Sequence, residues 1–464
     1  MTADDNTHIA YWDENNLYGG ALRQMLPCEN FEWLEREDFE AVDWNNINTE
    51  GEYGYTLKLD LEYPDNIHDK TQDFPLAPEP AVVTEDLLTP FMRQQWTRLC
   101  ELRERTEKYP ATKKLLMTCR DKQEYVVHFK LLKFYLKMGM RISKIHSVIK
   151  YRQAPIFKDY IDQNSERRKQ SRTEFEKDLF KLLNNALFGK TMENVRGRKD
   201  YRLPNTEEAF ERDSSKPHFL RAHRFSEDLV LTEMLKLEVK LCKPIFIGQA
   251  VLDLSKLTMF QLRYEKLPKY EARFGGTISV LAGDTDSLIC AVRNMDLQEV
   301  HRAMLQDGLL DTSNYNPSHP LFCDANKAKL GCIKDEVEGD DILEAVLLKP
   351  KAYSLRTLRQ KTSKNTAKGV QRSIREALTH EEYAEVYRNG DEIGRAMRRF
   401  QSTNHVVHTI QQQKWALSSV DNKRAWISQN ESYPYGHYML NDGPTAAKRS
   451  RREHLDDSPD SGVL

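Results

Sequence analysis

The sequence lacks several features that mark common classes of protein. Its seven cysteines are an odd number and form no CxxC pair, which argues against a disulfide framework and a four-cysteine zinc site and favours a reducing compartment. No run of about 18 apolar residues is present, so no membrane span is expected, and no apolar secretion signal opens the chain. The formal net charge of −2 gives no overall basic surplus that would indicate nucleic acid.

Charge is unevenly distributed along the 464 residues, a length sufficient for several subdomains around a large buried core. Residues 141–200 contain 15 Lys and Arg against 8 Asp and Glu, a local surplus of seven positive charges. The chain is therefore basic at this stretch and nearly neutral as a whole.

Residues Leu281–Cys290 have the pattern of a β-hairpin with two carboxylates at its tip. An apolar run leads to Gly283-Asp284-Thr285-Asp286 and a second apolar run follows, which predicts two strands joined by a tight turn. Taken alone, an Asp-x-Asp turn is more often a solvated loop than a functional site. Two other stretches favour the functional interpretation.

Another carboxylate is expected at a strand end near the N-terminus. His8–Trp12 is a predicted strand that ends at Asp13, turn residues extend to Gly20, and Ala21–Met25 begins a predicted helix. A carboxylate followed by a turn with free backbone N–H groups suits a metal ligand. The alternative is an ordinary aspartate that closes a strand.

Ile156–Val195 is predicted to form two helices with a turn between them. Four cations crowd the turn near residues 164–171: Arg167, Arg168, Lys169 and Arg172. Lys177, Lys181 and Asn185 then follow at i, i+4 steps along one helical face, and Phe188 comes three residues later. Such a face suits a triphosphate held by ammonium groups and a base stacked on an aromatic ring. The alternative is a solvated helix with Phe188 in the core.

Several other segments have recognisable periodicity. Tyr53–Tyr63 alternates as a half-buried strand does. Helices are expected at Gln94–Thr118, Tyr125–Met140, Ile247–Leu267 and residues 374–400. Within the second of these, Lys130, Lys133 and Lys137 form a basic stripe, which indicates either a solvated face or contact with a nucleic-acid backbone.

The carboxylates and the cationic helix together suggest one chemistry. Asp13 and Asp286, far apart in sequence and each at a strand end, are expected to converge on two divalent cations about 4 Å apart. Mg²⁺ favours such carboxylates together with substrate phosphates. Lysines that hold a triphosphate beside these ions indicate phosphoryl transfer to a 3′-hydroxyl, with Lys181 supplying charge or a proton to the leaving pyrophosphate.

Four motifs, in order along the chain, resemble those of family B DNA polymerases. They are Asp13-x-x-Asn16-Leu17-Tyr18, Lys181-x-x-x-Asn185-Ala186-x-Phe188-Gly189, Gly283-Asp284-Thr285-Asp286-Ser287 and Lys351-Ala352-Tyr353. Other segments resemble the protein-primed branch of viruses and large self-synthesising DNA transposons: Phe157–Asp162, Phe175–Val195, Val251–Lys256, Asp421–Arg424 and Tyr435–Tyr438. The resemblance covers roughly residues 8–440.

The resemblance implies a function for each matching residue. Asp13 and Asp286 would bridge two Mg²⁺ ions, with Mn²⁺ as a substitute, and Asp284 would be a less direct carboxylate. Leu17 would offer its backbone to the triphosphate and Tyr18 would exclude a ribose 2′-hydroxyl. The nucleotide would further contact Arg168, Lys169, Lys177, Lys181, Asn185 and Phe188. Lys351 and Tyr353 would contact the primer strand, which makes primer-template DNA and dNTPs the expected partners.

The resemblance also implies an α+β right-hand fold with an antiparallel-sheet palm, helical fingers and a C-terminal thumb. The expected boundaries are palm at 1–154 and 246–365, fingers at 155–195, an insertion at 196–245, thumb at 366–440 and a disordered tail at 441–464. Residues 20–110 and the insertion 196–245 lie where the protein-primed branch carries its two terminal-protein insertions, so the resemblance makes a terminal priming protein a further candidate partner. Lys448–Arg452 is a candidate nuclear import signal, with a random basic patch as the alternative.

The chain departs from the family pattern at several positions. Gly19 replaces a proline, Ala282 replaces a tyrosine beside the acidic hairpin, and Phe188 replaces a tyrosine. Because the first motif begins at residue 13, no 3′–5′ exonuclease domain is expected before it. Two alternatives to a polymerase stay open: a remnant that binds DNA or nucleotide without catalysis, and a metal-dependent nuclease, which would not need the Lys177, Lys181 and Asn185 face.

Overall fold

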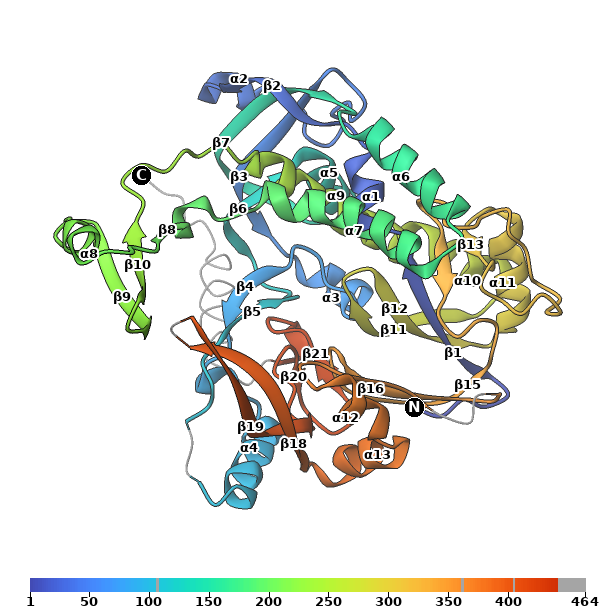
Figure 1. Cartoon of the computed structure of the whole chain (residues 1–464). Helices are drawn as coiled ribbons and strands as arrows, with labels where there is room; N and C mark the ends of the chain where they lie inside the picture. The colour runs from blue at the N-terminus through green and yellow to red at the C-terminus, as the bar shows by residue number, and fades with distance from the viewer. Residues whose placement is uncertain (106–107, 360–362, 404, 441–464) are drawn as a thin grey trace, which may run out of the picture.

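The computed structural model describes residues 1–105, 108–359, 363–403 and 405–440 (Figure 1). The expected tail 441–464 and its import signal lie outside these residues. None of the helices in the described part of the chain is both long and apolar enough to cross a membrane. No disulfide joins any of the seven cysteines, all of which lie within the described residues.

A central five-stranded sheet has the strand order β11-β12-β1-β14-β13. Its strands are β1 (Thr7–Glu14), β11 (Thr277–Asp284), β12 (Ser287–Arg293), β13 (Leu310–Asp311) and β14 (Ile333–Asp335). All neighbours are antiparallel except β13 and β14. β1 therefore lies between the second arm of the acidic hairpin and β14, as a central strand with a partner on each side.

Alternate residues of β1 pack into different cores because successive side chains of a strand point to opposite faces. Ala10 and Trp12 join the core formed with α10 (Leu267–Phe274) and α11 (Leu297–Gln306). Ile9 and Tyr11 join the core formed with β15 (Ile342–Lys349) and β16 (Ala352–Thr357). Both faces of the strand are thus covered, and Asp13 belongs to the face of Ile9 and Tyr11.

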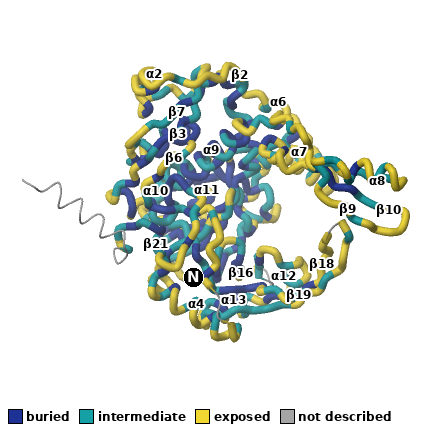
Figure 2. Tube along the Cα trace, turned by 90° about the vertical axis from the view of Figure 1, so that its left-hand side faces the viewer, coloured by how far each residue is buried: buried dark blue, intermediate teal, exposed yellow. Residues whose placement is uncertain are grey.

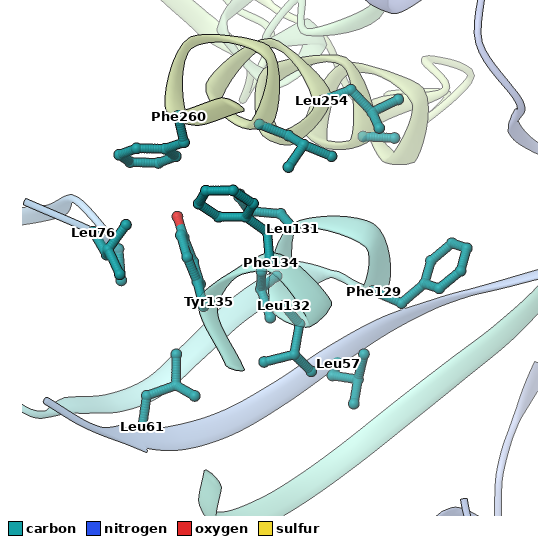
Figure 3. Close-up of a cluster of buried hydrophobic side chains, with 14 of the residues drawn as sticks. Leu57, Leu61, Leu76, Phe129, Leu131, Leu132, Phe134, Tyr135, Leu254 and Phe260 are labelled. Atoms are coloured by element: carbon teal, nitrogen blue, oxygen red, sulfur yellow. The ribbon is translucent and has the colours of Figure 1, made fainter. Parts of the chain in front are cut away.

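A second antiparallel sheet, in the order β2-β7-β3-β6, carries the largest core (Figure 3). Its strands are β2 (Leu26–Trp33), β3 (Tyr53–Glu62), β6 (Lys122–His128) and β7 (Arg141–Ala154). Leu57 and Leu61 of β3 pack against α5 (Phe129–Met138), and Phe260 of α9 (Ile245–Gln261) closes the cluster above it. The short helix α1 (Leu17–Leu22) connects the two sheets, and it packs against α9.

Two helices lie side by side over α1 and α9: α6 (Lys158–Gln170) and α7 (Glu174–Thr191) (Figure 1). Thr173 begins α7 with a capping box, since its hydroxyl accepts the N–H of Glu176 and the Glu176 carboxylate accepts the N–H of Thr173. Asn164 donates a buried hydrogen bond of 3.0 Å to Asn184, which locks the two helices together.

The remaining elements lie around and between the two sheets (Figure 1). The predicted insertion contains β8 (Lys199–Arg202), α8 (Glu207–Ser214), β9 (Phe219–Ser226) and β10 (Leu229–Leu235). The C-terminal part contains β17 (Lys364–Ala367), α12 (Arg372–Ala377), α13 (His380–Asn389), β18 (Glu392–Thr403) and β19 (Val406–Ser418). Smaller elements are α2 (Arg36–Glu40), α3 (His68–Thr71), β4 (Glu79–Val82), α4 (Pro90–Leu102), β5 (Lys113–Leu116), β20 (Ala425–Trp426) and β21 (Ser432–Tyr433).

The long β18–β19 hairpin reaches the predicted insertion at its tip (Figure 2). The His405 ring lies edge-on to Tyr201 at 5.2 Å between centroids, and its Nε2 is 3.8 Å from the Glu233 carboxylate. Two segments far apart in sequence thus meet at a distance from the central sheet.

The α+β class with antiparallel sheets is confirmed, but several predicted helices are wrong in part. The segment 125–140 is strand to His128 because β6 pairs with β3, and it is helical only afterwards. In 94–118, α4 ends at Leu102 and β5 pairs with β4. In 374–400, Gly390 ends α13 in a left-handed conformation and β18 follows. In each of these segments the strand forms because it pairs with a partner strand, and local periodicity carries no information about that partner.

Two further predictions are corrected by contacts. The helix expected to begin at Ala21 begins instead at Leu17, because Asn16 in a left-handed conformation (φ 52°) caps it by accepting the Gly19 N–H. The basic stripe is not one uniform face. Lys130 is buried and bonds Glu50 at 2.9 Å, Lys133 is half-buried and bonds the Ile47 carbonyl at 2.8 Å, and Lys137 is exposed to solvent and bonds Glu265 at 2.7 Å.

Candidate active site

The strand register brings Asp13 and Asp286 together at one end of the central sheet. Asp13 lies opposite Ser287, and the Glu14 N–H donates to the Asp286 carbonyl at 2.7 Å. The hairpin tip is tight because Thr285 adopts a left-handed conformation (φ 64°) and the Asp286 N–H reaches the Asp284 carbonyl at 2.7 Å. Two carboxylates from distant parts of the sequence thus share one strand end.

The two carboxylates repel each other in a partly buried place. Burial raises the pKa of Asp13 to about 7, with further contributions from Asp286 and Glu336. Burial and the neighbouring Asp284 raise the pKa of Asp286. Lys181 opposes both shifts, so its ammonium group lies close enough to act on the pair. The raised pKa values show that the ionised forms of both carboxylates are disfavoured here, and a bound divalent cation would stabilise them.

The donor set fits Mg²⁺ better than a cation held by protein alone. Within the described ranges, no group of three or more His, Cys, Asp and Glu side chains is arranged to hold a metal ion by itself. Mg²⁺ is commonly bound by one or two carboxylates, with waters and substrate phosphates completing the shell. Asp13 and Asp286 would be the protein ligands in such a site.

Asp284 forms an ion pair with the β15–β16 turn, while its charge also acts on Asp286. The Lys351 ammonium lies 2.9 Å from the Asp284 carboxylate, and this hydrogen bond raises the pKa of Lys351. Lys351 itself is held in a left-handed conformation (φ 63°) at the turn between the two strands. The structure therefore places Lys351 beside the acidic hairpin, where its charge also acts on Asp286 and Tyr18.

Tyr353 has a buried position beneath the site. Its hydroxyl is 2.8 Å from that of Tyr11, and its ring packs edge-on to the Tyr11 ring at 6.0 Å between centroids. Burial and this hydroxyl raise the pKa of Tyr11. Tyr353 thus joins the β15–β16 hairpin to β1, while its expected contact with a primer stays a prediction.

Tyr18 and Phe188 form a stacked pair between α1 and α7. Their ring centroids are 4.6 Å apart and their planes differ by 6°. Burial raises the pKa of Tyr18, and so does Asp286, which places this ring near the carboxylates. Leu17, one residue earlier, is buried in the core of the central sheet. The absence of a side chain at position 19 has a local cause: a Cβ at Gly19 would lie 2.3 Å from the Asn16 amide that caps α1.

The predicted cations of α6 and α7 differ in their surroundings. Lys181 acts on Asp13 and Asp286, whereas the Lys177 ammonium is 2.6 Å from Glu174 within its own helix. Lys169 lies 4.0 Å from Glu166, Arg168 is half-buried at the end of α6, and Asn185 is exposed on α7. Lys181 is therefore brought to the acidic strand ends, and the other residues line the helix pair around it.

Sequence reasoning missed two charged residues beside Asp13. Lys334 of β14 is its register partner, and Glu336 follows one residue beyond that strand. Burial alone would raise the pKa of Glu336, but Lys364 at 2.8 Å, Lys334 and Lys181 lower it. The only sequence signal was acidic residues after the short apolar run at 332–333, too common a pattern to single out.

The fold is of the α+β class expected of a right-hand polymerase, with carboxylates at the end of a central, largely antiparallel sheet and a helix pair beside them. The family described as DNA polymerase type B, organellar and viral, matches residues 4–262, more than half of the chain. The chain belongs to this family.

Similar solved structures include phi29 DNA polymerase complexed with primer-template DNA and incoming nucleotide substrates. That match has 14% sequence identity and a TM-score of 0.48 and covers 90% of this chain and 60% of that chain. For the orthorhombic crystal form of phi29 DNA polymerase, identity is 14%, TM-score 0.47, and coverage 89% of this chain and 58% of that chain. The chain thus spans about 60% of the length of these proteins. A comparison with curated proteins found no match.

Proposed function

We propose that this chain is a DNA-directed DNA polymerase core, which adds deoxynucleotides to a primer 3′-hydroxyl by two-metal phosphoryl transfer. The observation that carries the proposal is the register of β1 and β12, which brings Asp13 beside Asp286 within reach of the Lys181 charge. Family membership supports the same activity.

Each residue has a defined task in the proposed reaction. Asp13 and Asp286 would hold two Mg²⁺ ions, which supply charge that lowers the pKa of the attacking hydroxyl and stabilises the leaving pyrophosphate. Lys181 would bind the triphosphate and stabilise the charge that develops on its leaving oxygen. Arg168, Lys169 and Lys177 would extend this cationic surface along the helix pair.

The Tyr18–Phe188 stack would form one wall of the nucleotide site. A flat aromatic ring at this place lies against the sugar and leaves no room for a 2′-hydroxyl. Asn185 would line the nascent base pair, and Leu17 would offer its backbone to the triphosphate. Lys351, already beside the acidic hairpin, would turn to the primer strand when DNA is present.

Partners and cellular location belong to the same proposal. Primer-template DNA and dNTPs would be the substrates, and contacts with the duplex would fall mostly on its backbone because a polymerase accepts any sequence. A terminal priming protein, a nuclear location and the absence of proofreading stay predictions. Extension from a primer with a mispaired 3′ end, followed by sequencing of the product, would test the last of these.

The test of the proposed function is primer extension by the full chain with Mg²⁺ and dNTPs, with matched Asp286→Asn and Asp38→Asn variants. Asp38 is exposed on α2, away from the carboxylates, so Asp38→Asn should extend as the wild type does. Asp286→Asn should lose extension by about a thousandfold or more. An Asp286→Asn protein as active as the wild type would refute the proposal, and DNA binding without any incorporation by the wild type would favour the non-catalytic remnant.

A metal-dependent nuclease is the second candidate function to distinguish from a polymerase, because two cations held by carboxylates also suit hydrolysis. A nuclease does not need the α7 face. Protection of α7 from hydrogen exchange upon addition of a dNTP would therefore favour the polymerase, and degradation of the primer without protection would favour the nuclease.

A further inference from the structure

A chain of buried hydrogen bonds lies on the face of the central sheet opposite Asp13. The Trp12 indole N–H donates to His301 Nε2 at 3.0 Å. The Tyr315 hydroxyl is 3.3 Å from His301 Nδ1 and donates to Asp335 at 2.9 Å. All four side chains are at most 5% exposed. We name these residues, Trp12, His301, Tyr315 and Asp335, the back-face chain.

The hydrogen bonds of the back-face chain all point the same way: each side chain donates to the next, from Trp12 to Asp335. His301 Nε2 accepts from Trp12, so the neutral imidazole carries its hydrogen on Nδ1 and donates it to the Tyr315 oxygen. The Tyr315 hydroxyl donates a hydrogen bond to the Asp335 carboxylate. The two oxygens of this carboxylate also accept the N–H groups of Val337 at 3.2 Å and Gly339 at 2.8 Å. Burial lowers the pKa of His301, which favours this neutral form. Each ring is therefore held in one orientation.

The back-face chain joins β1, which carries Asp13, to β14, which carries Lys334. Trp12 of β1 is the register partner of Asp335 of β14, and Asp13 is the partner of Lys334. Because side chains alternate between the two faces of the sheet, Trp12 and Asp335 lie on the α11 face, while Asp13 and Lys334 lie on the face of Ile9 and Tyr11. His301 of α11 thus connects Trp12, the residue before Asp13, with Asp335, the residue before Glu336, through Tyr315.

We propose that His301 is a positioning residue that, through Trp12 and Tyr315, sets the place of the Asp13 carboxylate and so the affinity of the site for divalent cations. The inference deepens the proposed function and rests on it for the identity of the metal ligands. A metal site needs its ligands held within about 0.5 Å of the productive geometry, and supporting hydrogen bonds supply that precision.

The first experiment measures Mn²⁺ binding to the full chain without nucleotide or DNA, from the electron paramagnetic resonance signal of the free ion. The variants are Tyr315→Phe, which removes one hydroxyl, and Trp12→Phe, which removes the indole donor. Both should bind Mn²⁺ about tenfold more weakly than the wild type, as is typical when hydrogen bonds behind a metal ligand are lost. Primer extension should show the same shift in the Mn²⁺ concentration for half-maximal rate, with the KM for dNTP at saturating Mn²⁺ unchanged.

Tyr383→Phe is the matched control. Tyr383 is fully buried and donates a hydrogen bond of 3.0 Å to the Thr366 carbonyl, away from the central sheet. It should lose as much thermal stability as Tyr315→Phe but bind Mn²⁺ as the wild type does. Wild-type affinity in both back-face variants, or an equal loss in Tyr383→Phe, would overturn the inference.

The second experiment reads the hydrogen position directly, by ¹⁵N NMR of histidine-labelled protein. His301 should be neutral with its hydrogen on Nδ1, and Trp12→Phe should shift the Nε2 resonance. A hydrogen on Nε2 in the wild type would overturn the inference. Neither the resonance nor Mn²⁺ binding requires turnover, so a chain that extends no primer but shows both effects would refute the proposed polymerase and leave the positioning of Asp13 by His301 standing.

Discussion

At the scale of single residues, Asp13 is a carboxyl group whose ionised form is destabilised by its surroundings. It is partly buried, it lies beside Asp286 and Glu336, and Lys181 only partly offsets their effect. A residue selected for stability alone would not be a carboxylate at this place. The arrangement is typical of a functional carboxylate that binds a cation.

The raised pKa of Asp13 predicts a pH-dependent stability of the metal-free protein. The carboxyl titrates at about 7 in the folded chain against an ordinary 3.8, so the folded state holds a proton that the unfolded chain has already lost. This favourable contribution is fully present below the ordinary pKa and is lost as the pH rises through 7. Asp13→Asn should therefore be more stable than the wild type at about pH 8, by about 2 kcal/mol, and equally stable at about pH 4.

Chemical denaturation in EDTA at the two pH values measures this difference. Asp38→Asn, exposed on α2, should match the wild type at both. If Asp13→Asn were less stable than the wild type at the higher pH, Asp13 would be stabilised by a partner that the structure does not contain. Added Mg²⁺ should reverse the order of stability, because only the wild type has both carboxylates.

The stack of Tyr18 on Phe188 predicts the selection of deoxyribonucleotides. Tyr18→Val removes the ring that would lie against the sugar and should lower the preference for dNTP over rNTP by about tenfold to a hundredfold. The ratio of kcat/KM for the two substrates is the measurement. Phe188→Tyr, which keeps an aromatic ring at the stack, should retain the wild-type ratio. An unchanged ratio in Tyr18→Val would assign selection to another residue.

At the scale of elements, α7 presents two lysines on one face with different surroundings. Lys181 acts on the carboxylates, and Lys177 bonds Glu174 one turn away. Lys181→Ala should lower kcat/KM for dNTP by about a hundredfold, since it removes a charge aimed at the triphosphate. Lys177→Ala should have a clearly smaller effect, with the same thermal stability. Equal losses in single-turnover incorporation would mean that the helix binds phosphate by its overall charge.

At the scale of the whole molecule, the β18–β19 tip contacts the predicted insertion, so two projections of the fold are joined to each other (Figure 2). On the proposed function, DNA that leaves the site under this contact would be retained by it. His405→Ala, which removes the contacts with Tyr201 and Glu233, should shorten the products made in one binding event. His408→Ala, exposed on the same hairpin, should not.

Primer extension in the presence of a heparin trap measures those product lengths. The incorporation rate for the first nucleotide should be the same in both variants, because the tip lies far from the carboxylates in the fold (Figure 1). Wild-type product lengths from His405→Ala would show that the contact does not retain DNA.

Much of the fold could be predicted where a local pattern was strong. The strand before Asp13, the strand over Tyr53–Tyr63, the acidic hairpin and the helix pair all have periodicities or turn residues that neighbours did not override. The predictions failed where partners decided the structure, as in β5, β6 and β18. The residues of the candidate site that could be predicted lie in the motifs or in the cationic turn before α7. Lys334, Glu336 and His301 lie outside these segments and were missed.

The sequence by itself determined which residue types stand at the strand ends and along α7, because hairpin turns, strand alternation and helical spacing are written in local order. It also determined membership of the polymerase family, through residues 4–262. Only the tertiary structure decided that Asp284 pairs with Lys351, that Lys181 and not Lys177 acts on Asp13 and Asp286, and that His301 bonds Trp12, the residue before Asp13. The reason is physical: register between strands and packing between helices place side chains whose positions in the chain carry no information about one another.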